Sequence, residues 1–197
     1  MRILHISDLH EKGPRELEPY FRQQVLGEHW LENINTILED GPIDAICFTG
    51  DIAQSGKPDE YAKVGEFIRE LTRLCNLGID RVFLVPGNHD IDRSINKAAW
   101  KAYRKLIHKT DPLVLSKWMA GLSSTPPLGM RRQLREEVLE RGQAFWRWIE
   151  SSLGLPDLLP RHSSHGTLGY RKILTLPGVV LPINIIGLDT SWLAGDE

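Results

Sequence analysis

Three runs of apolar residues, each followed at once by polar side chains, dominate the first ninety positions. They cover residues 2–7, 44–49 and 81–86 and are rich in Ile, Val, Leu and Phe. Continuous apolar runs of this length are typical of strands in a parallel sheet that is covered on both faces. The pattern therefore predicts three buried, parallel strands.

Between these runs, apolar side chains recur every three or four residues, which is the period of an amphipathic helix. This spacing predicts helices at about 22–40 and 58–75, the first of which ends at Gly41-Pro42. The resulting β-α-β-α-β order favours an α/β fold with right-handed crossovers between parallel strands.

The alternation of strands and helices stops after residue 90. We expect a helical cap inserted at about 91–165 into one domain that covers residues 1–197. Its helices are predicted at 95–108, 112–120 and 131–153, and further strands at 168–176, 179–182 and 184–189. Aromatic residues are frequent in this insertion, and we expect most of them to pack it onto the sheet.

Polar motifs follow the three predicted strands: Asp8-Leu9-His10, Gly50-Asp51 and Gly87-Asn88-His89-Asp90. Because chemistry in α/β sheets gathers at the carboxyl ends of parallel strands, we expect these motifs to surround one crevice. Carboxylate, amide and imidazole ligands suit divalent metals such as Mn, Fe or Zn. Gly-Asp alone is often a turn, but all three motifs in order at strand ends favour a metal site.

The spacing of the residues fits this interpretation. Asp8 and His10 are two positions apart, so in an extended segment they point to the same side and can hold one metal. Asp51 has two carboxylate oxygens, enough to bridge two ions. Asn88 offers a neutral carbonyl oxygen to the second ion.

These motifs, with the opening Ile3-Leu4-His5-Ile6-Ser7-Asp8-Leu9-His10, resemble those of the calcineurin-like metallophosphoesterases, especially their bacterial phosphodiesterase branch. The resemblance covers residues 1–95 and, more weakly, 166–192. It implies an α/β/β/α sandwich with a mostly parallel first sheet and two divalent metal ions, which could be Mn, Fe, Zn or Mg. It also implies the site: Asp8 and His10 on the first metal, Asp51 as the bridge, Asn88 on the second metal, His89 beside the phosphate, and Asp90 orienting His89.

The chain departs from the family pattern in its last part. The family completes its site with a histidine after a later strand and a Gly-His-x-His motif, and nothing in residues 91–197 matches the latter. His162 and His165 are alternative ligands, although they precede the last strands. We therefore expect the N-terminal portion of a longer domain with an incomplete second sheet, and further domains beyond residue 197.

Composition is ordinary for a globular protein, with 41% hydrophobic and 25% charged residues and a formal net charge of −2. Cys47 and Cys75 do not make a disulfide framework, and the first strand begins at once, without a signal peptide. The chain has no apolar run of membrane-spanning length. We expect a cytoplasmic protein without a membrane partner.

Charge is uneven along the chain, since residues 93–109 contain six Lys or Arg and no acidic residue. Lys97, Lys101, Arg104 and Lys105 share one side of a predicted helix. This is either a solvated face or a contact for phosphate or nucleic acid beside the metals.

The favoured function is a hydrolase: a metallophosphoesterase, with manganese among its candidate metals. The resemblance favours cleavage of a nucleotide or nucleic-acid diester, as by a nuclease. The resemblance implies that two metals activate a hydroxide and that His89 stabilises the transition state or protonates the leaving group. Two alternatives stay open, namely a non-catalytic binding module and an N-terminal effector domain of a larger regulated protein.

Overall fold

The computed structural model describes residues 1–16, 27–160 and 168–194 of the 197-residue chain. A sheet of three parallel strands forms its centre, with β2 (Ala45–Thr49) between β1 (Ile3–Ile6) and β3 (Val82–Val85). The carboxyl ends of all three strands therefore meet at one edge of this sheet. The predicted parallel strands and α/β class are confirmed.

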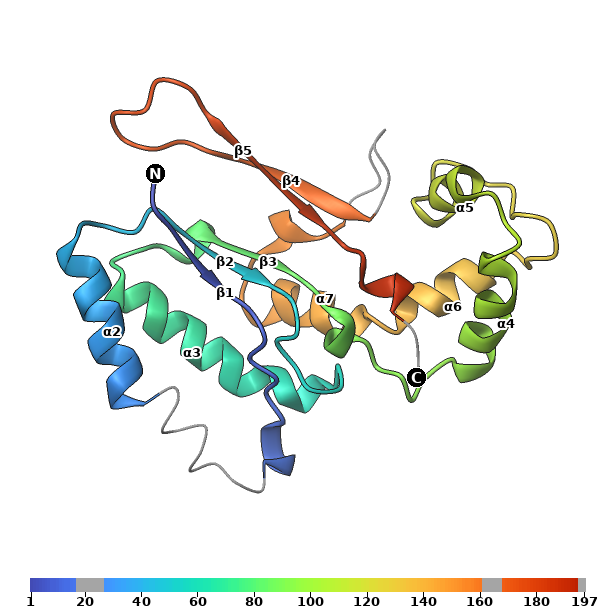
Figure 1. Ribbon diagram of the computed structural model, residues 1–197, viewed down its shortest axis with the longest axis horizontal. Coiled ribbons are helices and arrows are strands. Elements are labelled where there is room, and N and C mark those ends of the chain that lie inside the picture. Colours follow the sequence, from blue (N-terminus) through green and yellow to red (C-terminus); the bar gives the residue numbers. More distant parts are fainter. Residues whose placement is uncertain (17–26, 161–167, 195–197) are drawn as a thin grey trace.

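Helices cover one face of the sheet and a hairpin lies over the other (Figure 1). The helices are α2 (Glu28–Glu39) and α3 (Tyr61–Leu74), the latter preceded by the 3-10 turn η2 (Pro58–Glu60). The hairpin pairs β4 (Gly169–Leu174) with β5 (Ile183–Leu188) in antiparallel register. It is the second, smaller sheet that the sequence predicted.

Four helices lie between the two sheets in the sequence. They are α4 (Lys97–Ile107), α5 (Pro112–Met119), α6 (Leu134–Glu140) and α7 (Gln143–Ser151). The remaining 3-10 turns are η1 (Gly13–Arg15), η3 (Ile79–Arg81), η4 (Asn88–Asp90), η5 (Pro156–Leu158) and η6 (Ser191–Leu193). None of the helices in the described ranges is long and apolar enough to cross a membrane.

The apolar residues form two separate clusters rather than one. The main cluster joins the sheet, α3 and α7, with Phe145 and Trp148 among its buried aromatics. The second cluster joins α4, α5 and α6 around Trp100, Tyr103 and Trp118. The expected packing of aromatics onto the sheet therefore holds for α7, whereas α4–α6 have a core of their own.

Two predicted elements differ in the structure. The single helix predicted at 131–153 is wrong, because the chain forms two helices with a break at Gly142, where the backbone leaves helical geometry. At the break, the buried Arg141 places its guanidinium 4.7 Å from the centroid of the Trp100 ring. The strand predicted at 179–182 is wrong too, because these residues form the exposed tip of the hairpin, after Gly178 at a φ of +75°. The helix predicted from residue 22 is described only from Glu28.

Candidate metal centre

The loops after β1 and β2 run side by side and bring their polar residues together. His10 N–H donates to the Asp51 carbonyl at 2.9 Å, and Asp8 N–H donates to the Gly50 carbonyl at 3.3 Å. Ligand atoms of Asp8, His10 and Asp51 all lie within 4.8 Å of one another. The structure thus brings this part of the predicted site together.

The geometry of the first motif differs from the expected extended segment. Asp8, His10 and Asp51 have φ angles of 60°, 49° and 53°, in the left-handed region that side chains other than glycine rarely adopt. Even so, His10 Nε2 lies 3.8 Å from Asp8 Oδ1. Backbone strain of this kind tends to concentrate at functional sites, and here three such residues face each other.

The loop after β3 closes on the same place. Gly50 and Gly87 are in backbone contact, since a Cβ on Gly50 would lie 2.7 Å from the Cα of Gly87. A Cβ on Gly87 would in turn overlap the Asp51 carboxylate. Glycine at both positions therefore allows the two loops to approach each other, with Asp51 between them.

Asn88 and His89 complete the predicted set. Asn88 lines a crevice of about 400 Å³ together with Asp8, Asp51 and four residues of the last segment, Leu188, Thr190, Ser191 and Ala194. His89 N–H donates to Asp51 Oδ1 at 2.9 Å, and its ring lies perpendicular to that of His10 with 4.6 Å between centroids. The five residues predicted to surround one crevice are thus neighbours in the structure.

The contacts of Asp90 differ from those predicted. Among the described residues, no hydrogen bond joins Asp90 to His89, and the Nδ1 atom of His89 lies 2.8 Å from the Gln54 carbonyl oxygen. The Asp90 carboxylate is fully buried and accepts hydrogen bonds from the amides of Ile52, Ala53 and Gly87 and from the Tyr61 hydroxyl. Asp90 therefore ties the loop after β3 to the loop after β2.

The environment of Asp90 also changes its acidity. Burial raises the pKa of this carboxyl to about 6, although the three amide donors act in the opposite direction. The same carboxylate raises the pKa of the buried Tyr61 hydroxyl, on which burial itself has the larger effect. Gln54 and Tyr61 had no motif that marked them in the sequence.

The other predicted residues lie elsewhere. Lys97, Lys101, Arg104 and Lys105 are exposed on α4, outside the crevice. His162 and His165 fall outside the described residues. The sequence interpretation assigned no role to Thr190 or Ser191, which the structure places in the wall of the crevice.

Comparison with known proteins identifies the family. The family model described as calcineurin-like phosphoesterase matches residues 1–181, so the chain belongs to that family. The chain is 33% identical over 98 residues to the "uncharacterized metallophosphoesterase-like protein YydB" of Bacillus subtilis (strain 168), which is 49% of this chain and 19% of the relative. It is 29% identical over 142 residues to a subunit of the nuclease SbcCD of the same strain, which is 72% of this chain and 33% of the relative. The chain thus spans a third or less of either relative.

Metallophosphoesterases use divalent metal ions, and the residues of this crevice suit them. Two carboxylates, one imidazole and one amide carbonyl are a donor set for a borderline divalent cation.

Proposed function

We propose that this chain carries the catalytic centre of a metal-dependent phosphodiesterase that acts on a nucleotide or nucleic-acid diester. One observation carries the proposal: Asp8, His10 and Asp51 converge from two strand ends onto the crevice that Asn88 lines. Membership of the calcineurin-like phosphoesterase family supports phosphate-ester hydrolysis. The nuclease name of one relative favours a diester substrate.

The residues would divide between two divalent ions. Asp8 and His10 would hold the first, Asn88 the second, and Asp51 would be shared by both. When bound, such ions neutralise phosphate charge and lower the pKa of water so that it can attack phosphorus. Manganese is our choice for assays, because oxygen and imidazole donors both suit it.

His89 is placed to move a proton. Nδ1 of His89 lies 2.8 Å from the Gln54 carbonyl, which can only accept, and 3.4 Å from the Gln54 side-chain amide, which would donate. We infer from the shorter contact that Nδ1 carries the hydrogen. This leaves Nε2 as the atom that can face substrate. In its protonated form, Nε2–H would donate to the leaving oxygen of the diester.

The charge distribution points to a polyanionic substrate. Of the 24 Lys and Arg residues, ten lie in residues 93–135, with only one acidic residue, Asp111. This segment therefore carries a formal charge of +9 in a chain whose net charge is −2. A concentration of one sign on one part of a protein attracts and orients partners of the opposite sign.

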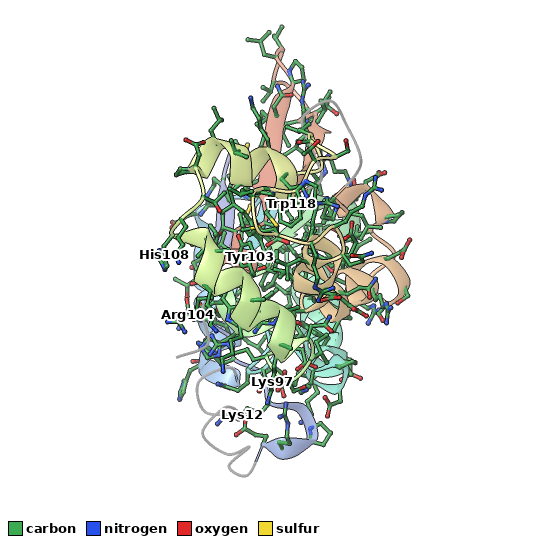
Figure 2. The ribbon with its side chains drawn as sticks, turned by 90° about the vertical axis from the view of Figure 1, so that its right-hand side faces the viewer. Lys12, Lys97, Tyr103, Arg104, His108 and Trp118 are labelled. Atoms are coloured by element: carbon green, nitrogen blue, oxygen red, sulfur yellow. The ribbon has the colours of Figure 1, made fainter. Side chains whose placement is uncertain are left out.

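Helix α4 presents part of this charge in a regular array. Lys97, Lys101 and Lys105 are exposed and four residues apart, a rise of about 6 Å per step along a helix. Figure 2 shows Lys97 toward one end of α4, and Arg104 and His108 toward the other end. The other side of the helix is fixed, because Trp100 and Tyr103 are buried. We propose that α4 contacts the phosphate backbone of the substrate.

The catalytic proposal is tested with manganese and bis-(p-nitrophenyl) phosphate. We expect hydrolysis of this diester to be faster than that of p-nitrophenyl phosphate, and His89→Gln to lower kcat by about 10²- to 10⁴-fold. Tight manganese binding without hydrolysis of any phosphate ester would contradict the proposal and favour a binding module.

The role of α4 is tested separately. Replacing Lys97, Lys101 and Lys105 by Gln should weaken binding of a single-stranded oligonucleotide. It should also lower the slope of log K against log salt by about 2, since each phosphate contact contributes about 0.7. The control variant carries Lys63→Gln and Arg73→Gln on the exposed side of α3. Equal salt slopes in both variants would show that α4 is only a solvated face.

A further inference from the structure

The turn that follows β5 forms one wall of the metal crevice. Leu188, Thr190, Ser191 and Ala194 line the crevice together with Asp8, Asp51 and Asn88. Thr190 is exposed, and its hydroxyl makes no hydrogen bond to any described residue. A hydroxyl in this position can donate to an oxygen of a ligand in the crevice.

The buried Asp189 holds this turn in place. Its Oδ1 accepts hydrogen bonds from Ser191 N–H at 2.9 Å and from Ser191 Oγ at 2.6 Å. The Trp146 side chain, on α7, acts to lower the pKa of the same carboxyl. Asp189 is 8% exposed and Ser191 4% exposed, so these bonds are shielded from water.

Asp189 is a costly residue to bury. Burial raises the pKa of its carboxyl, although the Ser191 and Trp146 donors act in the opposite direction. Within residues 1–16, 27–160 and 168–194, no Lys or Arg forms an ion pair with it. A buried carboxylate of this kind is tolerated because hydrogen bonds satisfy it, and here those bonds fix the backbone on both sides of Thr190.

The turn is also anchored to the second apolar cluster. The indole N–H of Trp192 donates to the Asp189 carbonyl at 2.9 Å. The ring of Trp192 meets Tyr103 of α4 edge to face, with 6.4 Å between centroids. Tyr103 is fully buried. The turn is therefore held on one side by its continuation from β5 and on the other by this contact with α4.

We propose that Thr190 is a phosphate-contacting residue of this site and that Asp189 positions it. The proposal rests on the proposed function in that both need phosphate to enter the crevice. It adds a ligand contact from the turn after β5, which lines the same crevice as Asp8, Asp51 and Asn88.

The test uses inorganic phosphate as the probe, titrated calorimetrically into the manganese-loaded protein. Thr190→Val removes the hydroxyl at nearly constant volume and should weaken phosphate binding by about tenfold to a hundredfold, as expected for one lost bond to a charged group. Thr190→Ser restores the hydroxyl and should bind within about threefold of the parent. The matched control, Thr125→Val, alters an exposed threonine in the cap.

Asp189→Ala tests the positioning role. It should lower phosphate affinity as much as Thr190→Val while manganese per chain stays unchanged. The double variant should be no weaker than either single one, because the two residues act through one contact. Additive losses, or a loss of manganese in Asp189→Ala, would overturn the positioning role.

The outcomes separate this inference from the catalytic proposal. If the parent binds phosphate through Thr190 but hydrolyses no diester, the catalytic proposal fails and this inference stands. If the parent hydrolyses the diester and Thr190→Val binds phosphate like the parent, this inference alone is overturned. A manganese-loaded parent that binds no phosphate would also overturn it.

Discussion

Replacing Asp90 by Asn tests which interactions hold the two central loops together. The parent carboxylate accepts from the amides of Gly87 and Ile52 at Oδ2, and from the Ala53 amide and the Tyr61 hydroxyl at Oδ1. Asparagine keeps one oxygen, so two of these four donors would face an NH₂ group instead. Each buried donor without an acceptor costs about 1–3 kcal/mol, which gives a loss of about 2–6 kcal/mol.

The assay is urea unfolding in the presence of EDTA, so that metal binding does not contribute to stability. A loss of this size is a large part of the roughly 5–15 kcal/mol that stabilises a typical protein. Tyr61→Phe removes a hydroxyl that lies 3.3 Å from Asp90 Oδ1 and 3.4 Å from the Asp90 carbonyl oxygen, and should cost about 1 kcal/mol. Asp80→Asn, whose parent side chain is 67% exposed, should change stability by less than about 0.5 kcal/mol. An Asp90→Asn variant as stable as the parent would refute the assigned role of Asp90.

Two further predictions follow from the same loops. Gly87→Ala would force the Asp51 carboxylate to move, so manganese affinity measured by calorimetry should fall at least tenfold. The control Gly65→Ala, whose new Cβ would lie 3.4 Å from its nearest atom, should bind manganese normally. Equal affinities in the two variants would contradict the close approach of the loops. Asp92 differs from Asp90: burial acts to raise its pKa, but Lys57 and Ser94 hold that pKa below its usual value. The contribution of Asp92 to stability should therefore be present above the unfolded pKa of 3.8 and be lost as pH falls through the folded pKa. The difference in unfolding free energy between the parent and Asp92→Asn should shrink at acidic pH. A difference that stays constant with pH would refute this prediction.

The residues at the strand ends could be predicted because the signal is local. Asp8, Asp51 and Asn88 each follow a buried apolar run, and parallel strands with helical crossovers necessarily bring such ends to one edge. The left-handed backbone of Asp8 and His10 was not predictable in the same way, since it results from bonds to the neighbouring loop.

The partner of His89 and the role of Asp90 depend on contacts between distant segments. Gln54 is 35 residues from His89, and Tyr61 is 29 residues from Asp90. No short pattern encodes such pairs, so the pairing of Asp90 with His89 rested on the family resemblance alone. Thr190 was missed for the same reason, because only the packing of the second sheet brings it to the crevice.

The break in the long predicted helix shows a limit of periodicity. Val138 and Phe145 are both buried, and their seven-residue spacing continues one helical face across Gly142. They nevertheless belong to different apolar clusters. Val138, on α6, packs in the second cluster, whereas Phe145, on α7, packs in the main cluster. Helix α6 ends at Glu140, and the chain passes at Arg141-Gly142 from the second cluster to the main cluster.

The central claim is that the crevice at the strand ends is a metal-dependent catalytic site with Asp51 at its middle. The most direct test is elemental analysis of manganese per chain for the parent and for Asp51→Asn, with bis-(p-nitrophenyl) phosphate hydrolysis on the same samples. We predict that the parent retains manganese and hydrolyses the diester, and that Asp51→Asn loses most of both. An Asp51→Asn variant with the manganese content and turnover of the parent would contradict the claim.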